Sequence, residues 1–589
     1  MTVPTRADIV AEAERGTLLD AIFQNTWDCR YDHHEALVEA LAAGHNSGEI
    51  DLLSLLRPQC LDLFQSHVRD YGLQIYGKLL GKLNTPAEPF LHTLGALYKA
   101  DGVDSYTATD ALATWCAASQ SRPLELLNLI DDRFPGAAKY HCLAISIQCG
   151  LKVDTVHFSD RAYEFLRSGE HSQKVDVIRA FLAAPLVEEE EWRKLLGVFQ
   201  TVLARETSEE IRGAVLKTVL SWFQSAPPAL AEAIHSLVIH AATPTTANVA
   251  REIAYALAFS FKDLASTVRE SLLTALYPID PDVDTLNLVD LGLAHFIEIG
   301  DGERARNYLE ALILREGRQF SFSNFDSVIR KLHEGQPEGL DEWVVAWLNS
   351  GSYRLCQELD EGLFDGKDDH RFQIDFARFR LTEFEYCFVA RKAIAAFFLK
   401  PVTIATLLTS LGRSATPPQT EELQDLLFDP LLINYPSLAE KYLRSVAEDE
   451  EDVARPMVKY ALARLEDYRH GIDQIGCVPE LHPSERERQI EWQRHSDSMA
   501  DAMQKGSKQS FLMDLFPQRI LLYGNGMVSW VGGAPESARQ GEIPTTPPRR
   551  IEMELTGFSH QFELPREEVL DRTSLHIKLM SFKLEKLPK

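Results

Sequence analysis

The sequence predicts a mainly α-helical protein, an irregular α-solenoid of paired helices that ends in a small C-terminal α+β module. Apolar residues recur at helical spacing through most of residues 1–480, and short breaks containing Gly or Pro separate the periodic segments. From residue 519 the spacing changes to an alternation around an Asn-Gly turn, which is typical of strands. A chain of 589 residues is too long for one core, so we expect several domains or a repeat array.

We divide the chain into four segments. They are an N-terminal helical region (1–120), helical repeats (121–320), a further helical region (321–480) and a C-terminal helix with the α+β module (481–589). In the first segment, short amphipathic helices alternate with polar breaks. Gly44 is a helix stop signal, and Pro58 opens or kinks a helix.

The second segment carries a recurring arginine. Four helical stretches place a branched apolar residue or Ala directly before Arg179, Arg212, Arg251 and Arg269, with apolar residues three or four positions later. These arginines are 33, 39 and 18 residues apart, which matches one helix-pair repeat twice and then about half of one. The pattern resembles HEAT repeats, whose second helix often carries a Val-Arg step followed by Ala and Leu. That resemblance implies stacked helix pairs with a long surface for contacts.

Residues 291–313 are similar instead to a TPR-type helix pair. Gly300 would end the first helix, and Ala305, Tyr308 and Leu312 would pack the second. One helix pair cannot bury its apolar face alone, so stacking on neighbouring pairs would form a continuous core. We therefore expect a mixed array rather than a uniform one.

The third segment contains the most apolar stretch, residues 372–401, which is rich in Phe and too apolar for a surface helix. We expect it at the centre of a core. The acidic run Glu448–Asp452 marks a solvated helix start, since acids favour a helix N-terminus.

The last segment begins with Ser484 and Glu487, which have the spacing of a capping box and predict a long, charged helix. Residues 519–533 then predict a β-hairpin, with Asn525-Gly526 supplying the turn. Residues 550–558 predict a third strand, 560–564 a possible fourth, and 565–587 an amphipathic helix that completes the module. The stretches "LLYGNGMVSWV" and "FELPREE" are similar to a C-terminal module of bacterial proteins.

The composition excludes several classes. Lys and Arg number 60 against 87 Asp and Glu, and the net charge of −27 disfavours general nucleic-acid binding. No apolar run reaches the length of a membrane helix, and the N-terminus lacks the apolar core of a secretory signal. None of the eight cysteines forms a CxxC pair, so we expect reduced, mostly buried thiols and a cytoplasmic location.

No catalytic signature is present, so the sequence assigns no catalytic, cofactor-binding or metal-binding residue. Two clusters were weighed as metal sites. Cys29 and His33 are four residues apart, the spacing that places two ligands on one helix face, but no second pair accompanies them. Clustered carboxylates can hold a metal ion, and such a cluster lies at Asp365, Asp368, Asp369 and His370. Because of the neighbouring Gly366 and the density of charge, an exposed acidic turn is the preferred interpretation of that cluster.

These observations favour a non-catalytic scaffold or adaptor that needs no cofactor and holds protein partners in a multi-subunit complex. Helical-repeat proteins of this bacterial type often serve multi-gene assemblies, and the resemblance implies such an assembly, antiviral defence systems among them. One alternative is a metal-dependent hydrolase or nuclease with a site near Asp365–His370. Another is a nucleic-acid-binding accessory subunit that uses its C-terminal lysines, which are Lys578, Lys583, Lys586 and Lys589.

Overall fold

The computed structural model describes residues 4–24, 34–55, 66–101, 106–133, 142–183, 186, 188–317, 320–335, 337–364, 370–475, 483–509, 519–521, 526–531, 549–554 and 563–588. The chain is mainly helical, as predicted. It divides into two compact units, Met1–Leu340 (unit 1) and Asp341–Lys589 (unit 2). The four-segment division of the sequence stays a prediction. In the described part of the chain, no helix combines the length and hydropathy needed to cross a bilayer.

Unit 1 is a succession of α-helices joined by short turns. Its helices are α1 (Arg6–Arg15), α2 (Leu18–Phe23), α3 (His34–Asn46), α5 (Ser66–Gly81), α6 (Ala87–Asp101), α7 (Tyr106–Ala117), α8 (Arg122–Arg133), α9 (Cys142–Leu151), α10 (Thr155–Ser168), α11 (His171–Ala180), α12 (Glu189–Arg205), α13 (Glu209–Ser221), α14 (Ala231–Ala242), α15 (Ala247–Phe259), α16 (Ser266–Leu276), α17 (Val283–Glu298), α18 (Gly302–Ile313) and α19 (Asp326–Glu334). Helix α20 (Pro337–Asn349) crosses the boundary between the units.

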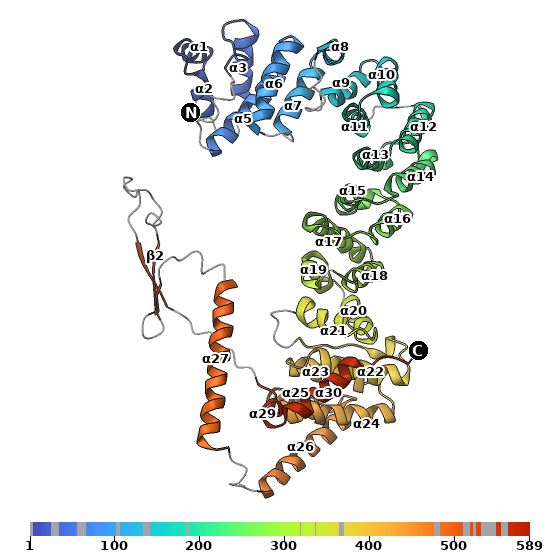
Figure 1. Cartoon of the computed structure of the whole chain (residues 1–589), viewed down its shortest axis with the longest axis vertical. Helices are drawn as coiled ribbons and strands as arrows, with labels where there is room; N and C mark the ends of the chain where they lie inside the picture. The colour runs from blue at the N-terminus through green and yellow to red at the C-terminus, as the bar shows by residue number, and fades with distance from the viewer. Residues whose placement is uncertain are drawn as a thin grey trace. The chain divides into compact units, whose positions relative to one another are not determined.

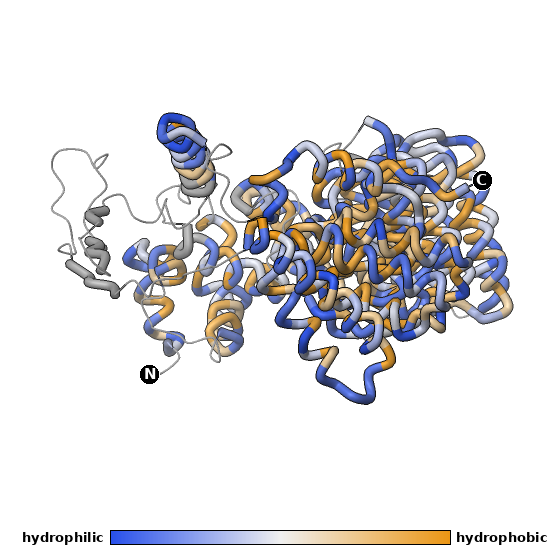
Figure 2. The backbone as a smooth tube through the Cα atoms, turned by 90° about the horizontal axis from the view of Figure 1, so that it is seen from below, coloured by the Kyte–Doolittle hydropathy of each residue, from blue (hydrophilic) through white to orange (hydrophobic). Residues whose placement is uncertain are grey.

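The helices of unit 1 form two layers. Each odd-numbered helix from α5 to α19 contacts the next odd-numbered one, and the even-numbered helices from α10 to α16 do likewise. Figure 1 shows the odd layer on the inside of the bend of this unit. Apolar and polar residues alternate along the helical tube in Figure 2, because each helix buries one stripe against its neighbours. This arrangement is compatible with the predicted α-solenoid.

Aromatic side chains fill the space between the layers. The indole Nε1 of Trp222 donates a hydrogen bond to the Phe181 carbonyl oxygen at 2.9 Å. Its ring lies 5.4 Å from that of Trp192 and 5.1 Å from that of Phe199, both on α12. All four side chains are buried. The polar indole nitrogen is therefore satisfied inside an otherwise apolar contact.

Polar side chains also connect neighbouring pairs. The buried Asp290 of α17 accepts hydrogen bonds from the backbone N–H groups of Ser327 and Val328, at 2.9 and 3.0 Å. These donors belong to the first turn of α19, whose N-terminal N–H groups have no partner within their own helix. Gly292 allows α17 to approach α15 closely, since a Cβ at this position would lie 2.9 Å from the Leu257 Cβ. Each helix thus depends on the preceding pair.

Unit 2 contains a deeply buried helical core. Its helical elements are α21 (Tyr353–Glu358), η8 (Leu359–Leu363), η9 (Phe376–Arg378), α22 (Glu383–Ala396), α23 (Pro401–Gly412), α24 (Pro417–Leu426), η10 (Leu427–Leu432), α25 (Leu438–Glu448), α26 (Arg455–Ile475), α27 (Glu485–Gln509), α29 (Arg566–Leu570) and α30 (Arg572–Leu584). Every residue of α23 is buried, as are most residues of α22. The prediction that residues 372–401 lie at the centre of a core is confirmed for α22.

The C-terminal segment contains the predicted capping box and a set of paired strands. Ser484 and Glu487 form the predicted capping box, with Ser484 N–H donating to Glu487 at 2.8 Å and Glu487 N–H donating to the Ser484 hydroxyl at 3.3 Å. Strand β2 (Gly526–Val531) pairs antiparallel with β1 (Arg519–Leu521) and with β3 (Arg549–Glu554). Of the predicted Asn525-Gly526 turn, Gly526 is the first residue of β2, whereas Asn525 and most of the possible fourth strand lie outside the described residues.

The independent α+β module that the sequence predicts is not shown. Its terminal helix, α30, packs on α22 of the helical core and on the neighbouring α29, and Leu575 and Leu579 are buried. The apolar stripe of α30 was correctly recognised, but an apolar stripe does not specify which surface covers it. Proximity in sequence suggested the sheet, whereas the helical core provides the actual contact.

Candidate interaction surface

The residues weighed as metal ligands do not form a site in the described part of the chain. Cys29, His33, Asp365, Asp368 and Asp369 lie outside the described residues. The ring of His370 lies 4.7 Å from that of Phe364 and 4.5 Å from that of Phe372, so it contributes to an aromatic cluster. Where the chain is described, no three His, Cys, Asp or Glu side chains are grouped closely enough to hold a metal ion. The five described cysteines are free, and all but the half-buried Cys149 are buried.

The C-terminal lysines are partly engaged within the chain. Lys578 pairs with Asp429, and the ammonium group of Lys583 lies 5.0 Å from the centre of the Tyr353 ring. The carbonyl oxygen of Lys583 also accepts a hydrogen bond from the Lys392 ammonium group at 2.8 Å. These contacts favour a role for this helix in closing unit 2.

The four recurring arginines have different structural roles. Arg212 is nearly buried, and its guanidinium donates to the carbonyl oxygens of His240 and Thr243 at 3.0 and 2.7 Å. It thereby satisfies carbonyl groups at the end of α14. Arg269 donates to the Leu264 carbonyl at 2.8 Å and lies over the Phe261 ring at 4.4 Å. Arg179 and Arg251, in contrast, line a cavity. The sequence pattern therefore identified helices of one type but not one shared function.

That cavity lies on the odd layer of unit 1 and has a volume of about 740 Å³. We call it the odd-layer groove. It crosses five consecutive odd-numbered helices, α7, α9, α11, α13 and α15, with residues from Thr109 to Tyr255 along its walls. Ala144, Gly213 and Ala214 are among its lining residues and are buried. Their small side chains leave room between the larger residues of neighbouring helices.

The walls of the groove carry both signs of charge. Glu209 and Glu210 stand at the start of α13, and Lys217 lies two turns later on the same helix. Arg251 and Glu252 stand near the start of α15. Although the chain as a whole is strongly acidic, the groove combines cationic and anionic groups, which can orient a partner by paired contacts of both signs.

An exposed aromatic pair borders the groove. Tyr255, which lines it, is 48% exposed, and Phe259, one turn further along α15, is 61% exposed. Their ring centres are 4.8 Å apart, and the Lys217 ammonium group lies 5.7 Å from the Tyr255 ring centre. Exposed aromatic groups of this size are frequent energetic anchors of protein interfaces. The groove therefore combines room, charges of both signs and an apolar anchor.

A signal for this pair exists in the sequence. Ile253 and Leu257 are buried on α15, and each aromatic residue follows one of them by two positions. Two positions turn a helix by about 200°, so Tyr255 and Phe259 face away from the buried stripe. From the sequence alone, this stretch indicates only an apolar helix.

Comparison of the sequence with models of known protein families and with curated proteins finds no match.

Proposed function

We propose that this chain is a non-catalytic α-solenoid scaffold or adaptor that holds a partner protein in the odd-layer groove. The exposed Tyr255–Phe259 pair beside the groove is the observation that carries the proposal. Isolated apolar side chains on a surface are ordinary, but two exposed aromatic rings in contact, with planes tilted by 52°, form an anchor for a partner beside a hollow of this size. The geometry needs no cofactor.

The partner that suits this groove is a protein segment with an apolar side chain for the aromatic pair and charged groups of both signs beside it. Neighbouring helix axes are about 8–10 Å apart, so the four spacings between five helices give a path of roughly 32–40 Å. An extended segment of about ten to twelve residues covers that length. We place the complex in a multi-component bacterial assembly, with antiviral defence systems as the setting that the sequence resemblance implies.

The test compares matched aromatic variants. The wild-type chain, Tyr255→Ala/Phe259→Ala and Tyr460→Ala are purified from the native host, and bound proteins are identified and quantified. Tyr460 is 53% exposed and lies in unit 2, so it controls for the loss of an exposed tyrosine. We expect one stoichiometric partner that the groove variant loses and the control retains. Identical partners in all three preparations, or an active enzyme purified without partners, would exclude this function.

A further inference from the structure

A second cavity in unit 1 has a different chemistry. It has a volume of about 200 Å³ and is lined by α10, α11, α12 and Glu206 at the end of α12. Leu166, Val198 and Val202 form an apolar part of its wall. We call it the cationic cleft. It shares no lining residue with the odd-layer groove, so ligand binding in this cleft does not depend on the proposed scaffold function.

Four cationic side chains line this cleft, but only one carboxylate does. Lys174 pairs with that carboxylate, Glu206, at 2.6 Å. Lys194 pairs with Asp160 at 3.3 Å and lies 4.8 Å from the ring centre of Tyr163. The remaining two, Arg167 and Arg205, form no ion pair or hydrogen bond within the described part of the chain. Two guanidinium groups are thus available at one cavity.

The charge of the whole chain makes this grouping significant. With a net charge of −27, a carboxylate is the commonest neighbour that a surface arginine can find. Both arginines also end helices, Arg167 in the last turn of α10 and Arg205 in that of α12, where a cation offsets the helix dipole. Compensation of the helix dipole explains why these arginines lie at helix ends. It does not explain why both arginines, two lysines and an apolar wall line the same cavity.

The cleft is open because of a glycine. Gly197 lines it from the middle of α12, and a Cβ at this position would meet no atom within 4 Å. Glycine inside a helix is less favourable than alanine, and packing does not require it here. The absent side chain instead leaves the apolar wall accessible from the cationic side.

We propose that the cationic cleft binds a small organic phosphate, whose phosphate group pairs with Arg167 and Arg205 and whose apolar part contacts Leu166, Val198 and Val202. The planar guanidinium group matches the geometry of phosphate oxygens and forms paired, charge-assisted hydrogen bonds with them. Lys174 and Lys194 add positive potential around the same hollow. The small volume selects a ligand of about the size of an aryl phosphate rather than a polymer.

The test uses phenyl phosphate as the probe and calorimetric titration of the full chain. Inorganic phosphate supplies the anion without the apolar part, and phenylacetate replaces phosphate by a carboxylate. We expect phenyl phosphate to bind at one site and more tightly than either comparison compound. Affinity should fall by about tenfold or more in Arg167→Ala and in Arg205→Ala, because each loses a charge-assisted hydrogen bond.

Two further variants separate binding from folding. Gly197→Leu fills the open position without meeting another atom at Cβ, so it should remain folded and lose phenyl phosphate binding. Arg193→Ala removes an α12 arginine that does not line the cleft and should bind as the wild type does. Absence of saturable phenyl phosphate binding, equal affinity for inorganic phosphate or phenylacetate, or unchanged binding in both cleft arginine variants would overturn the proposal.

Discussion

Units 1 and 2 are both built from amphipathic helices, but they differ in how much of the surface of these helices the rest of the chain covers. In unit 1 each helix pair is covered by the next, and the odd layer keeps a groove with an exposed aromatic pair. In unit 2 a segment from the far end of the chain, residues 563–588, covers part of the core. The difference shows that a helical array leaves a surface for partners only where its own chain does not cover it.

The closing segment of unit 2 is held mainly by polar contacts. The fully buried Lys392 donates to the carbonyl oxygens of Lys583 and Glu585, both at 2.8 Å. Arg391 forms a two-point ion pair with the Glu585 carboxylate, at 2.6 and 2.8 Å. Burial lowers the pKa of the Lys392 ammonium group. A buried ammonium group is tolerated in the folded protein only while the carbonyl oxygens that accept its hydrogen bonds remain in place.

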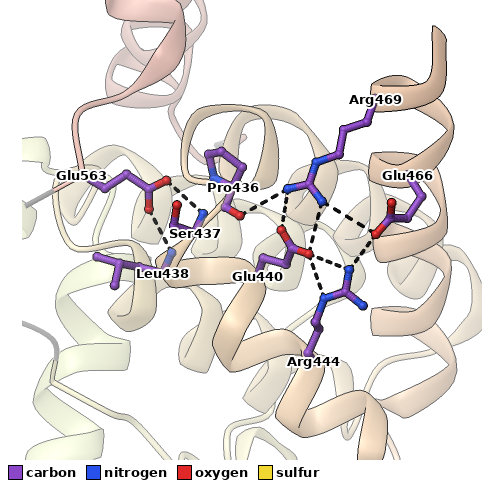
Figure 3. A network of polar contacts seen from close by, with 8 residues as sticks. All are labelled: Pro436, Ser437, Leu438, Glu440, Arg444, Glu466, Arg469 and Glu563. Atoms are coloured by element: carbon purple, nitrogen blue, oxygen red, sulfur yellow. Dashed lines mark hydrogen bonds and ion pairs between the residues drawn. The ribbon is translucent and has the colours of Figure 1, made fainter. Parts of the chain in front are cut away.

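A second set of contacts holds the other end of this segment. Asn434 and Glu567 exchange two hydrogen bonds, at 2.8 and 2.9 Å. The Glu563 carboxylate accepts from the N–H groups of Ser437 and Leu438, both at 2.9 Å, at the start of α25 (Figure 3). An acceptor here satisfies N–H groups that the helix itself cannot pair. The segment thus supplies a helix cap that the local sequence lacks.

Removing the closing segment should produce the largest effect. Deleting residues 563–589 exposes the surface that covers Leu575 and Leu579 and leaves Lys392 without two acceptors. Removing one partner of a buried charged group costs about 3–5 kcal/mol. Unit 2 should therefore unfold at a temperature well below the unfolding temperature of unit 1. Thermal unfolding followed by circular dichroism and limited proteolysis measures this. Deleting α27, whose described side chains are exposed, is the control. An unchanged transition of unit 2 would contradict the role assigned to the segment.

The packing of unit 1 is tested at Trp222. Trp222→Ala removes a fully buried indole and should lower the free energy of unfolding by about 3–5 kcal/mol, since a cavity replaces the side chain. Urea denaturation provides the measurement. Trp492→Ala serves as the matched control, because Trp492 is 69% exposed on α27, and its effect should stay within about 0.5 kcal/mol. Similar losses for both variants would show that the layers are not tightly packed.

A comparison of Arg212 and Arg251 tests whether arginines in the same sequence pattern have different structural roles. Arg212→Ala leaves two carbonyl groups at the end of α14 without their donor and should cost about 1.5–3 kcal/mol. Arg251→Ala, in the wall of the groove, should change the free energy of unfolding by less than about 0.5 kcal/mol. Urea denaturation compares the two. The reverse order of effects would make Arg251 the structural residue and remove it from the interaction surface.

The smallest effect concerns the ion-pair network of α25 and α26 in Figure 3. Hydrogen bonding from Arg469, at 2.5 Å, and from Arg444 lowers the pKa of Glu440 below its usual value of 4.5. A lowered folded-state pKa means that this carboxylate stabilises the fold above pH 4.5 and loses its contribution as the pH falls through the folded-state pKa.

Glu440→Gln should therefore lower the melting temperature at about pH 7, and the difference from wild type should shrink below pH 4.5. Thermal unfolding at a series of pH values measures this. Glu451→Gln, at an exposed carboxylate, is the control and should show little effect throughout. A difference that grows as the pH falls would contradict the assigned sign.

Local features of the fold could be predicted from the sequence because they depend on neighbouring residues. Helical spacing identified the helices, the Ser484–Glu487 spacing identified a capping box, and the apolar density of residues 372–401 identified a core. The candidate surface was not predicted. Tyr255 and Phe259 can be recognised as exposed only when the buried face of α15 is known.

By itself, the sequence indicated which stretches are helical and which stripe of each helix must be buried. It did not determine every helix end, because α3 continues through Gly44, the predicted stop, to Asn46. Only the tertiary structure decided what covers each stripe. Helix α30 packs on α22 rather than on the sheet. Of the four similar arginines, Arg212 binds carbonyl groups at a helix end, Arg269 lies over an aromatic ring, and the other two line the groove. The odd layer remains accessible. The reason is that periodicity determines the direction of an apolar face, whereas the identity of its neighbour depends on shape complementarity between segments far apart in the chain.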